Sequence, residues 1–282
     1  MSNVLGESNS YRADIQGLRA IAILVVVCYH SGIFFKSGFV GVDVFFAISG
    51  YVISSSLIRE IEGNGKIGVS QFYARRIRRL LPALAVMLSI VLFASTWLSA
   101  LSARVQTVRT GIFATFSAAN LFLFRFRPDG YFVVGEKTNA LLHTWSLSIE
   151  EQFYLVWPLI FFLTPQRHYY LVFPLVIIAS LFYRSFYSDI ETHTLGVISD
   201  MAMGGWAAYL SFTNQKFISR ISASPIFLSM VPYLVVFLIM LFKYDLFYTQ
   251  ALIIWKRIII GLFFSWIILD QNFNSKCLIP LS

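Results

Sequence analysis

The chain has 282 residues, of which 57% are hydrophobic and only 13% are charged, and its mean hydropathy is +0.71. Because soluble domains keep about a quarter of their residues charged, this composition excludes an ordinary soluble domain and indicates a protein embedded in lipid. The net charge of +8 does not indicate nucleic-acid binding. The basic residues flank apolar segments, where they set orientation in the membrane or bind an anionic ligand.

About nine apolar runs long enough to cross a bilayer follow one another along the chain. They cover residues 18–35, 39–58, 80–100, 108–124, 148–163, 170–187, 195–210, 226–242 and 251–269. Strands of a membrane barrel would alternate apolar and polar residues, and these runs do not. We therefore predict an all-α, polytopic bundle of about nine transmembrane helices.

The distribution of basic residues predicts the orientation of the bundle. Between the first two runs the only basic residue is Lys36, whereas several separate the second run from the third. They are Arg59, Lys66, Arg75, Arg76, Arg78 and Arg79. Because cytoplasmic loops carry the excess of Lys and Arg, the N-terminus is expected in the cytoplasm. Residues 1–17 would then form a cytoplasmic tail, and residues 18–282 the membrane-embedded domain.

The first run contains an unusual pair of polar residues, Arg19 and His30. They are eleven residues apart, about three helical turns, so they share one helix face and are separated by a rise of about 16 Å. Arg19 is expected at the cytoplasmic boundary. The simplest interpretation of Arg19 is an anchor whose side chain snorkels to the membrane interface. His30 is expected well inside the membrane, where an ionisable residue is a functional candidate. The alternative is an imidazole that simply packs against a neighbouring helix.

The second run contains Asp43 and Ser49. Asp43 would lie near the outer end, where it either orients a histidine or is solvated at the boundary. Because a hydroxyl inside a helix usually bonds a carbonyl of its own helix, Ser49 is interpreted as structural.

A basic helix entry, "QFYARRIRRLLPAL", precedes the third run and is expected to lie at the inner membrane interface. It contains two overlapping Arg-x-x-Arg pairs, Arg75 with Arg78 and Arg76 with Arg79. Guanidinium groups three residues apart face the same way and suit phosphate oxygens. The residues alone favour the simpler interpretation, that the cluster binds anionic lipid.

The segment "HTWSLSIEEQFYLVWPL" places carboxylates at the start of an apolar run. Glu150 and Tyr154 are four residues apart and share a helix face. A carboxylate at this position needs a partner, such as an arginine, the His30 imidazole or a substrate hydroxyl. His143 and Trp145 precede the run and would line an entrance or belong to an interfacial aromatic belt.

Other chemistries find no support in the sequence. The four histidines are scattered without metal-ligand spacing, so no metal site is expected. No phosphate-binding glycine loop or nucleophile-elbow motif is present. The two cysteines do not indicate a disulfide framework.

Four of these segments together resemble the acyltransferase 3 family of integral-membrane acyltransferases, of the O-antigen and polysaccharide O-acetylase type. They are "YRADIQGLRAIAILVVVCYH", "GFVGVDVFFAISGYVI", "FYARRIRRLLPAL" and "LLHTWSLSIEEQFYLVWPL". The resemblance implies transfer of an acyl group, usually acetyl, from cytoplasmic acyl-CoA to a sugar hydroxyl of a surface polysaccharide or lipopolysaccharide. It implies a bacterial inner-membrane protein whose partners are acyl-CoA, a polysaccharide or lipid-linked glycan, and membrane lipid. Acetyl-CoA is then a donor substrate, and no bound cofactor is expected.

The resemblance also implies roles for single residues. The family's Arg-x10-His pattern falls on Arg19 and His30, and its Arg-x-x-Arg pattern on Arg76 and Arg79. Glu150 corresponds to the family carboxylate. Arg76 and Arg79 would bind the phosphates of acyl-CoA, and His30 would act as general base or accept the acyl group transiently. Asp43, His143, Trp145 and Tyr154 are candidates for the substrate site.

Two other hypotheses stay open at this stage. Members of the family usually have one further helix and often an SGNH domain, whereas this chain ends at "NSKCLIPLS", so an inactive truncated remnant is one alternative. The other is a transporter or flippase that moves an acyl donor or glycan intermediate.

Overall fold

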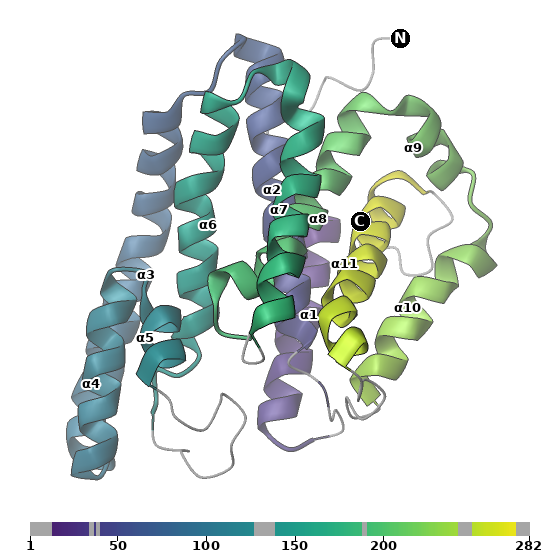
Figure 1. Ribbon diagram of the computed structural model, residues 1–282. Coiled ribbons are helices and arrows are strands. Elements are labelled where there is room, and N and C mark those ends of the chain that lie inside the picture. The colour runs from purple at the N-terminus through teal and green to yellow at the C-terminus, as the bar shows by residue number, and fades with distance from the viewer. Residues whose placement is uncertain are drawn as a thin grey trace.

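The computed structural model describes the backbone of residues 13–33, 37, 40–126, 139–187, 191–241 and 250–274. Within these ranges the regular structure is entirely helical, which confirms the predicted all-α class. In chain order the helices are α1 (Ala13–His30), α2 (Val40–Asn64), α3 (Val69–Leu98), α4 (Leu101–Thr115), α5 (Ala119–Phe126), α6 (Thr144–Leu163), the short 3-10 helix η1 (Gln166–His168), α7 (Tyr169–Phe186), α8 (Thr194–Thr213), α9 (Gln215–Ser222), α10 (Ile226–Leu241) and α11 (Gln250–Phe273). Figure 1 shows that they pack into one bundle, with α3 and α4 at one side and α10 at the other.

Each predicted apolar run falls on a single helix, except residues 108–124. There α4 ends at Thr115 and α5 begins at Ala119, so the prediction of one continuous helix was wrong. Ser117 lies between them with a φ of 54°. Its hydroxyl donates to the Glu151 carboxylate, and its carbonyl accepts from the Gln152 amide at 2.6 Å. The second of these bonds satisfies a backbone carbonyl that the break releases from the helix.

Four helical segments in the described part of the chain are long and apolar enough to cross a membrane: α1, α2, α3, and η1 together with α7. A fifth is counted if α9 and α10, which meet at 91°, form one broken span. The chain is therefore a multi-pass membrane protein by composition and helix length. The predicted count of nine and the cytoplasmic N-terminus stay predictions.

The basic entry to the third run forms the start of α3. This helix is continuous from Val69 to Leu98 and carries the arginines in its first turns, and its position at the inner membrane interface stays a prediction. Pro82, which belongs to the entry, lies inside α3 without ending it.

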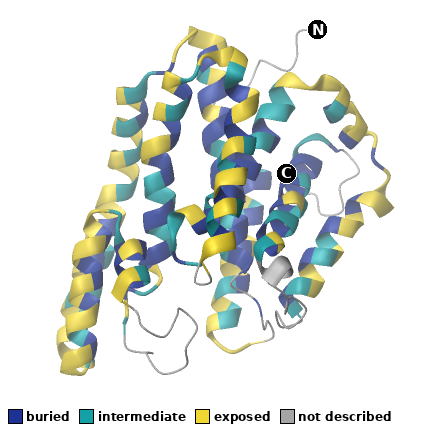
Figure 2. Cartoon of the chain, in the orientation of Figure 1, coloured by how far each residue is buried: buried dark blue, intermediate teal, exposed yellow. Residues whose placement is uncertain are grey.

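Helix α2 forms the centre of the bundle. In its most apolar window 78% of the residues are buried, compared with 17% in α3, and Figure 2 shows the same contrast between dark α2 and yellow α3 and α4. Its most extensive packing is against α8. A Cβ on Gly50 would overlap the carbonyl oxygen of Met201, and one on Gly204 would overlap that of Ala47. The two backbones therefore touch, as at other membrane helix crossings built on small residues.

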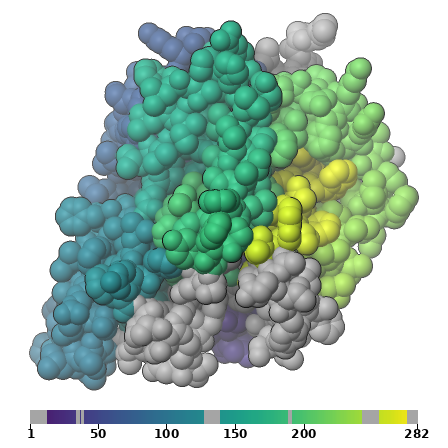
Figure 3. Space-filling view, viewed as in Figure 1, coloured from purple at the N-terminus to yellow at the C-terminus, as the bar shows by residue number. Residues whose placement is uncertain are grey.

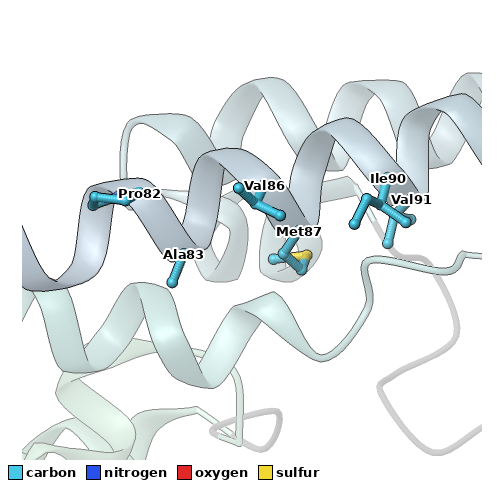
Figure 4. Close-up of a pocket in the computed structure, with 6 residues that line it drawn as sticks. All are labelled: Pro82, Ala83, Val86, Met87, Ile90 and Val91. Atoms are coloured by element: carbon cyan, nitrogen blue, oxygen red, sulfur yellow. The ribbon is translucent and has the colours of Figure 1, made fainter.

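The outer surface of the bundle is largely apolar. Exposed side chains such as Ile90, Phe93 and Trp97 line α3, as expected for contact with lipid tails. An open hollow on this helix is lined by six residues (Figure 4): Pro82, Ala83, Val86, Met87, Ile90 and Val91. All six are apolar, so the hollow offers no chemical group for a reaction. On the face shown in Figure 3, atoms of α7 lie beside the yellow atoms of α11.

Candidate active site

Three helices bring four polar side chains together in the middle of the bundle, and we call them the central cluster: Ser49 of α2, Arg76 of α3, and Glu150 and Tyr154 of α6. The hydroxyls of Ser49 and Tyr154 both donate to Oε1 of Glu150. Those two hydroxyl oxygens are themselves 3.2 Å apart. Tyr154 reaches the carboxylate because it lies one turn further along the same helix.

The Glu150 carboxylate therefore has two unlike oxygens. Oε1 accepts both hydroxyls, whereas no hydrogen bond to Oε2 occurs among the described residues. The Glu150 side chain is only partly buried. The hydroxyls of Ser49 and Tyr154 were not among the three partners that the sequence suggested, whereas one suggested partner, an arginine, is close, because Arg76 interacts electrostatically with Glu150.

The Arg76 guanidinium packs over the face of Tyr154, with its carbon 4.6 Å from the ring centroid, and lies 5.6 Å from the Phe72 centroid. Such cation–π contacts orient an arginine without neutralising it. Arg76 also interacts electrostatically with Glu150, Arg79 and Arg19. The structure thus brings together residues predicted from three separate segments of the sequence.

The two members of the Arg-x-x-Arg pair are not equivalent. Arg76 is half-buried and faces the central cluster, whereas Arg79 is exposed, as are Arg75 and Arg78. Arg75 lies 3.7 Å from Glu60, and Arg78 donates to the carbonyl of Ala74 in its own helix. Arg76 and Arg79 are still close enough for their positive charges to repel each other.

His30 lies elsewhere, and its expected position well inside the membrane stays a prediction. It is the last residue of α1 and is exposed at the surface of the described bundle. Helix α1 begins at Ala13 and ends five residues before the predicted run does. Its Nδ1 donates to the carbonyl of Val26 at 2.8 Å. Because Nδ1 carries the proton, the neutral imidazole presents Nε2 as a base.

His143 lies close enough to His30 for the two imidazoles to influence each other. Partial desolvation lowers the pKa of His143, a hydrogen bond with the Ala140 backbone opposes this, and a positive charge on His30 lowers the pKa further. Trp145 does not belong to an interfacial belt. It is buried and meets Phe46 edge-on, with ring centroids 6.1 Å apart.

The expectation for Asp43 was also wrong. Its side chain is buried rather than solvated, and its carboxylate pairs with Arg257 of α11 at 2.7 Å rather than with a histidine. Sequence reasoning missed Arg257, and it gave Ser49 the wrong partner. The signal for Arg257 was present, since a charge inside an apolar run rarely lacks a buried partner.

The predicted site residues therefore fall into two groups. Arg19, Arg76, Arg79, Glu150 and Tyr154 interact around the central cluster. His30 and His143 lie together at the opposite end of α1, which is the lower end of the bundle in Figure 1.

Comparison with known proteins adds a family and relatives. A profile of the family described as "Acyltransferase domain" matches residues 12–282. Peptidoglycan O-acetyltransferase OatA of Listeria monocytogenes is 39% identical over 152 residues, which is 54% of this chain and 24% of that protein. O-acetyltransferase OatA of Staphylococcus aureus is 38% identical over 156 residues, 54% of this chain and 25% of its own length. The match thus spans about a quarter of each relative. No solved structure matches the chain.

Proposed function

The chain belongs to the acyltransferase domain family, and we propose that it is a membrane O-acyltransferase that moves an acetyl group from acetyl-CoA to a hydroxyl of a cell-surface glycan. The observation that carries the proposal is the central cluster. It places the Arg76 cation, the accessible Glu150 carboxylate and two hydroxyls within one contact network. Such a network suits a ligand that carries phosphates at one end and amide N–H groups further along.

The arginine end of the site would bind the donor. Arg76, Arg79 and Arg19 form a group of three positive charges with one nearby carboxylate, Glu150. Forked guanidinium groups bind phosphate oxygens through charge-assisted hydrogen bonds, so this end is proposed to hold the phosphates of acetyl-CoA. We expect this end to face the cytoplasm, where acyl-CoA is made available.

The histidine end would carry out the chemistry. His30 Nε2 takes the proton of the acceptor hydroxyl, and the hydroxyl oxygen attacks the thioester carbonyl carbon. The carbon–sulfur bond then breaks, and the proton on His30 passes to the leaving thiolate. The products are the O-acetylated glycan and free CoA. His143, whose lowered pKa favours its neutral form, does not repel the imidazolium that forms on His30.

The separation of the two ends fits a donor with a long arm. Arg19 and His30 are related by a rise of about 16 Å along α1. A donor bound through its phosphates near Arg76 must extend its thioester arm past Glu150 to reach His30. The free Oε2 of Glu150 is suited to accept a hydrogen bond from an amide of that arm.

The acceptor is proposed to be a polysaccharide, either an O-antigen sugar of lipopolysaccharide or peptidoglycan. One observation favours peptidoglycan as the second candidate, namely that the L. monocytogenes relative is named a peptidoglycan O-acetyltransferase. The protein would then work at the inner membrane, with its acceptor on the outer side.

The decisive experiment incubates membranes containing the protein with labelled acetyl-CoA and each of the two glycans. Label is expected on one glycan, and its loss in His30→Ala, with the variant still inserted in the membrane, supports the catalytic assignment. Label that crosses the membrane without transfer would indicate a carrier. Transfer by His30→Ala at the wild-type rate would refute the role of His30.

A further inference from the structure

A second group of charged residues lies outside the site described above, where α2, α8 and α11 meet near the lower end of the bundle in Figure 1. We call it the ion cluster. Its members are Asp43, Glu191, Asp200, Arg184, Lys256 and Arg257. None of them belongs to the central cluster, and the reaction described above uses none of them.

Arg257 is the centre of the ion cluster. Its side chain is 2% exposed, and its guanidinium contacts three carboxylates from different parts of the chain. Nη1 lies 2.7 Å from Asp43 of α2 and also bonds Asp200 of α8, while Nη2 bonds Glu191 in the segment before α8. Lys256 supports the same arrangement, because its Nζ lies 2.7 Å from Glu191.

Arg184 of α7 extends the ion cluster to a fourth helix. Its Nε donates to the carbonyl of Gly196 at 2.6 Å, and its Nη1 donates to the carbonyl of Ile254 at 3.1 Å. Its Nη2 bonds the hydroxyl of Ser199, which lies 3.3 Å from Asp200. Side chains of α7 and α11 therefore fix the start of α8, and through Asp43 the start of α2.

Net stability does not explain such an arrangement. Removing several charges from water is costly, and apolar residues of similar volume often stabilise a fold as well or better. In lipid, moreover, apolar side chains give helices little preference for one relative position over another. Directional bonds to a planar guanidinium define a position, because they are satisfied in only one arrangement of the helices.

The helix that the ion cluster fixes is the one that supplies Ser49 to the active site. Asp43 and Ser49 are six residues apart on α2, which corresponds to a rise of about 9 Å. Between them and beyond them α2 is in backbone contact with α8, at Ala47 and Gly50. A rotation or shift of α2 would therefore move Ser49 away from Glu150. It would also displace α1, which packs against α2 and ends at His30.

We propose that Arg257 is a positioning residue, which sets the depth and rotation of α2 so that Ser49 meets Glu150 and His30 keeps its place at the end of α1. The inference rests on the proposed acetyl transfer. The residue acts through Asp43 and does not touch the donor, so its loss lowers kcat and leaves the KM for acetyl-CoA unchanged.

The test compares four variants of the full chain, purified in detergent. Arg257→Gln removes one charge and leaves three carboxylates short of a partner, so it is expected to lower the unfolding temperature. Asp43→Asn combined with Arg257→Gln removes one charge of each sign and leaves the net charge of the cluster unchanged. This double variant is expected to be more stable than Arg257→Gln alone. Arg220→Gln, on the exposed face of α9, is the matched control.

For the double variant we expect a kcat about 100-fold below the wild type, since a misplacement of about 1 Å in an active site costs that much. Its KM for acetyl-CoA should equal that of the Arg220→Gln control. Arg257→Lys keeps the positive charge and loses the forked, planar guanidinium group. It therefore gives a folded protein in case the double variant does not fold, and its kcat should fall in the same way.

Two results would overturn the proposal. One is a wild-type kcat in the double variant or, where that variant does not fold, in Arg257→Lys. The other is a raised KM with an unchanged kcat, which would make Arg257 a donor-binding residue. Failure of the proposed function is a different result, namely that the wild-type protein itself transfers no acetyl group.

Discussion

Ser49 and Glu150 are 101 residues apart in the chain, yet the hydroxyl of the first donates to the carboxylate of the second. The bond joins the buried central helix α2 to α6, and Tyr154 donates to the same carboxylate oxygen. Arg76 from a third helix packs on the Tyr154 ring. Glu150 is therefore held by its neighbours through one oxygen, while the other accepts no hydrogen bond among the described residues.

Replacing Glu150 by Gln is expected to lower acetyl transfer about 100-fold, because the donor loses the charge that orients it. Gln keeps an acceptor for Ser49 and Tyr154, so the protein should remain folded. Glu151→Gln is the matched control, since Glu151 accepts from Ser117 on another side of α6. Rates are measured with labelled acetyl-CoA, and equal rates for the two variants would contradict the assignment of Glu150.

Replacing Arg76 by Ala is expected to raise the KM for acetyl-CoA about 10- to 100-fold. The reason is that a hydrogen bond to a charged group contributes about 1.5–3 kcal/mol, and 1.4 kcal/mol corresponds to about tenfold in affinity. Arg78→Ala, at an exposed position two residues further on, should leave the KM near the wild-type value. The same increase in both variants would mean that the donor is attracted by general positive charge rather than bound by Arg76.

Replacing Gly50 by Ala is expected to lower the free energy of unfolding by about 1–3 kcal/mol, the usual cost of overpacking. The added Cβ would overlap the carbonyl oxygen of Met201, so α2 and α8 must move apart. Gly63→Ala in the same helix is the control, because no atom lies within 4 Å of its Cβ position. Thermal unfolding in detergent checks both variants. If Gly50→Ala melts at the same temperature as Gly63→Ala, the backbone contact is not a feature of the protein in solution.

Lowering the pH is expected to destabilise the protein through His193. Desolvation lowers the pKa of His193, while the unfolded chain titrates near its usual value of about 6.5. The unfolded state therefore binds more protons below about pH 6.5, so this contribution to stability is present above that pH and is lost as the pH falls. The structure shows the reason: Nδ1 accepts from the Leu195 backbone at 3.2 Å, and the ring stacks on Tyr183.

The measurement is the unfolding temperature of the wild type and of His193→Gln above and below about pH 6.5. The variant should show a smaller decrease on acidification, with a residual slope of the same sign from His143, whose pKa is also lowered. His168→Gln, in η1, serves as control. An identical decrease in the wild type and in His193→Gln would contradict this origin of the pH dependence.

The helices could be read from the sequence because apolar runs of this length have no other stable form in lipid. Residues 148–163 and 170–187 were predicted as runs, and α6 and α7 end within one residue of those limits. The run 108–124 failed because its break depends on bonds that Ser117 makes to residues of α6. Such bonds leave no trace in local hydropathy.

The sequence by itself determined the class of the protein, the positions of most helices and the residue types of the candidate site, because composition and helix periodicity are properties of short segments. It also presented Arg19, Arg76 and Glu150 as candidates. Only the tertiary structure decided that these three interact around one cluster and that His30 does not join them. Only the tertiary structure paired Asp43 with Arg257, which are 214 residues apart. A charged residue in an apolar segment requires a buried partner, so the sequence indicates that a partner exists. The packing of the helices determines which residue that partner is.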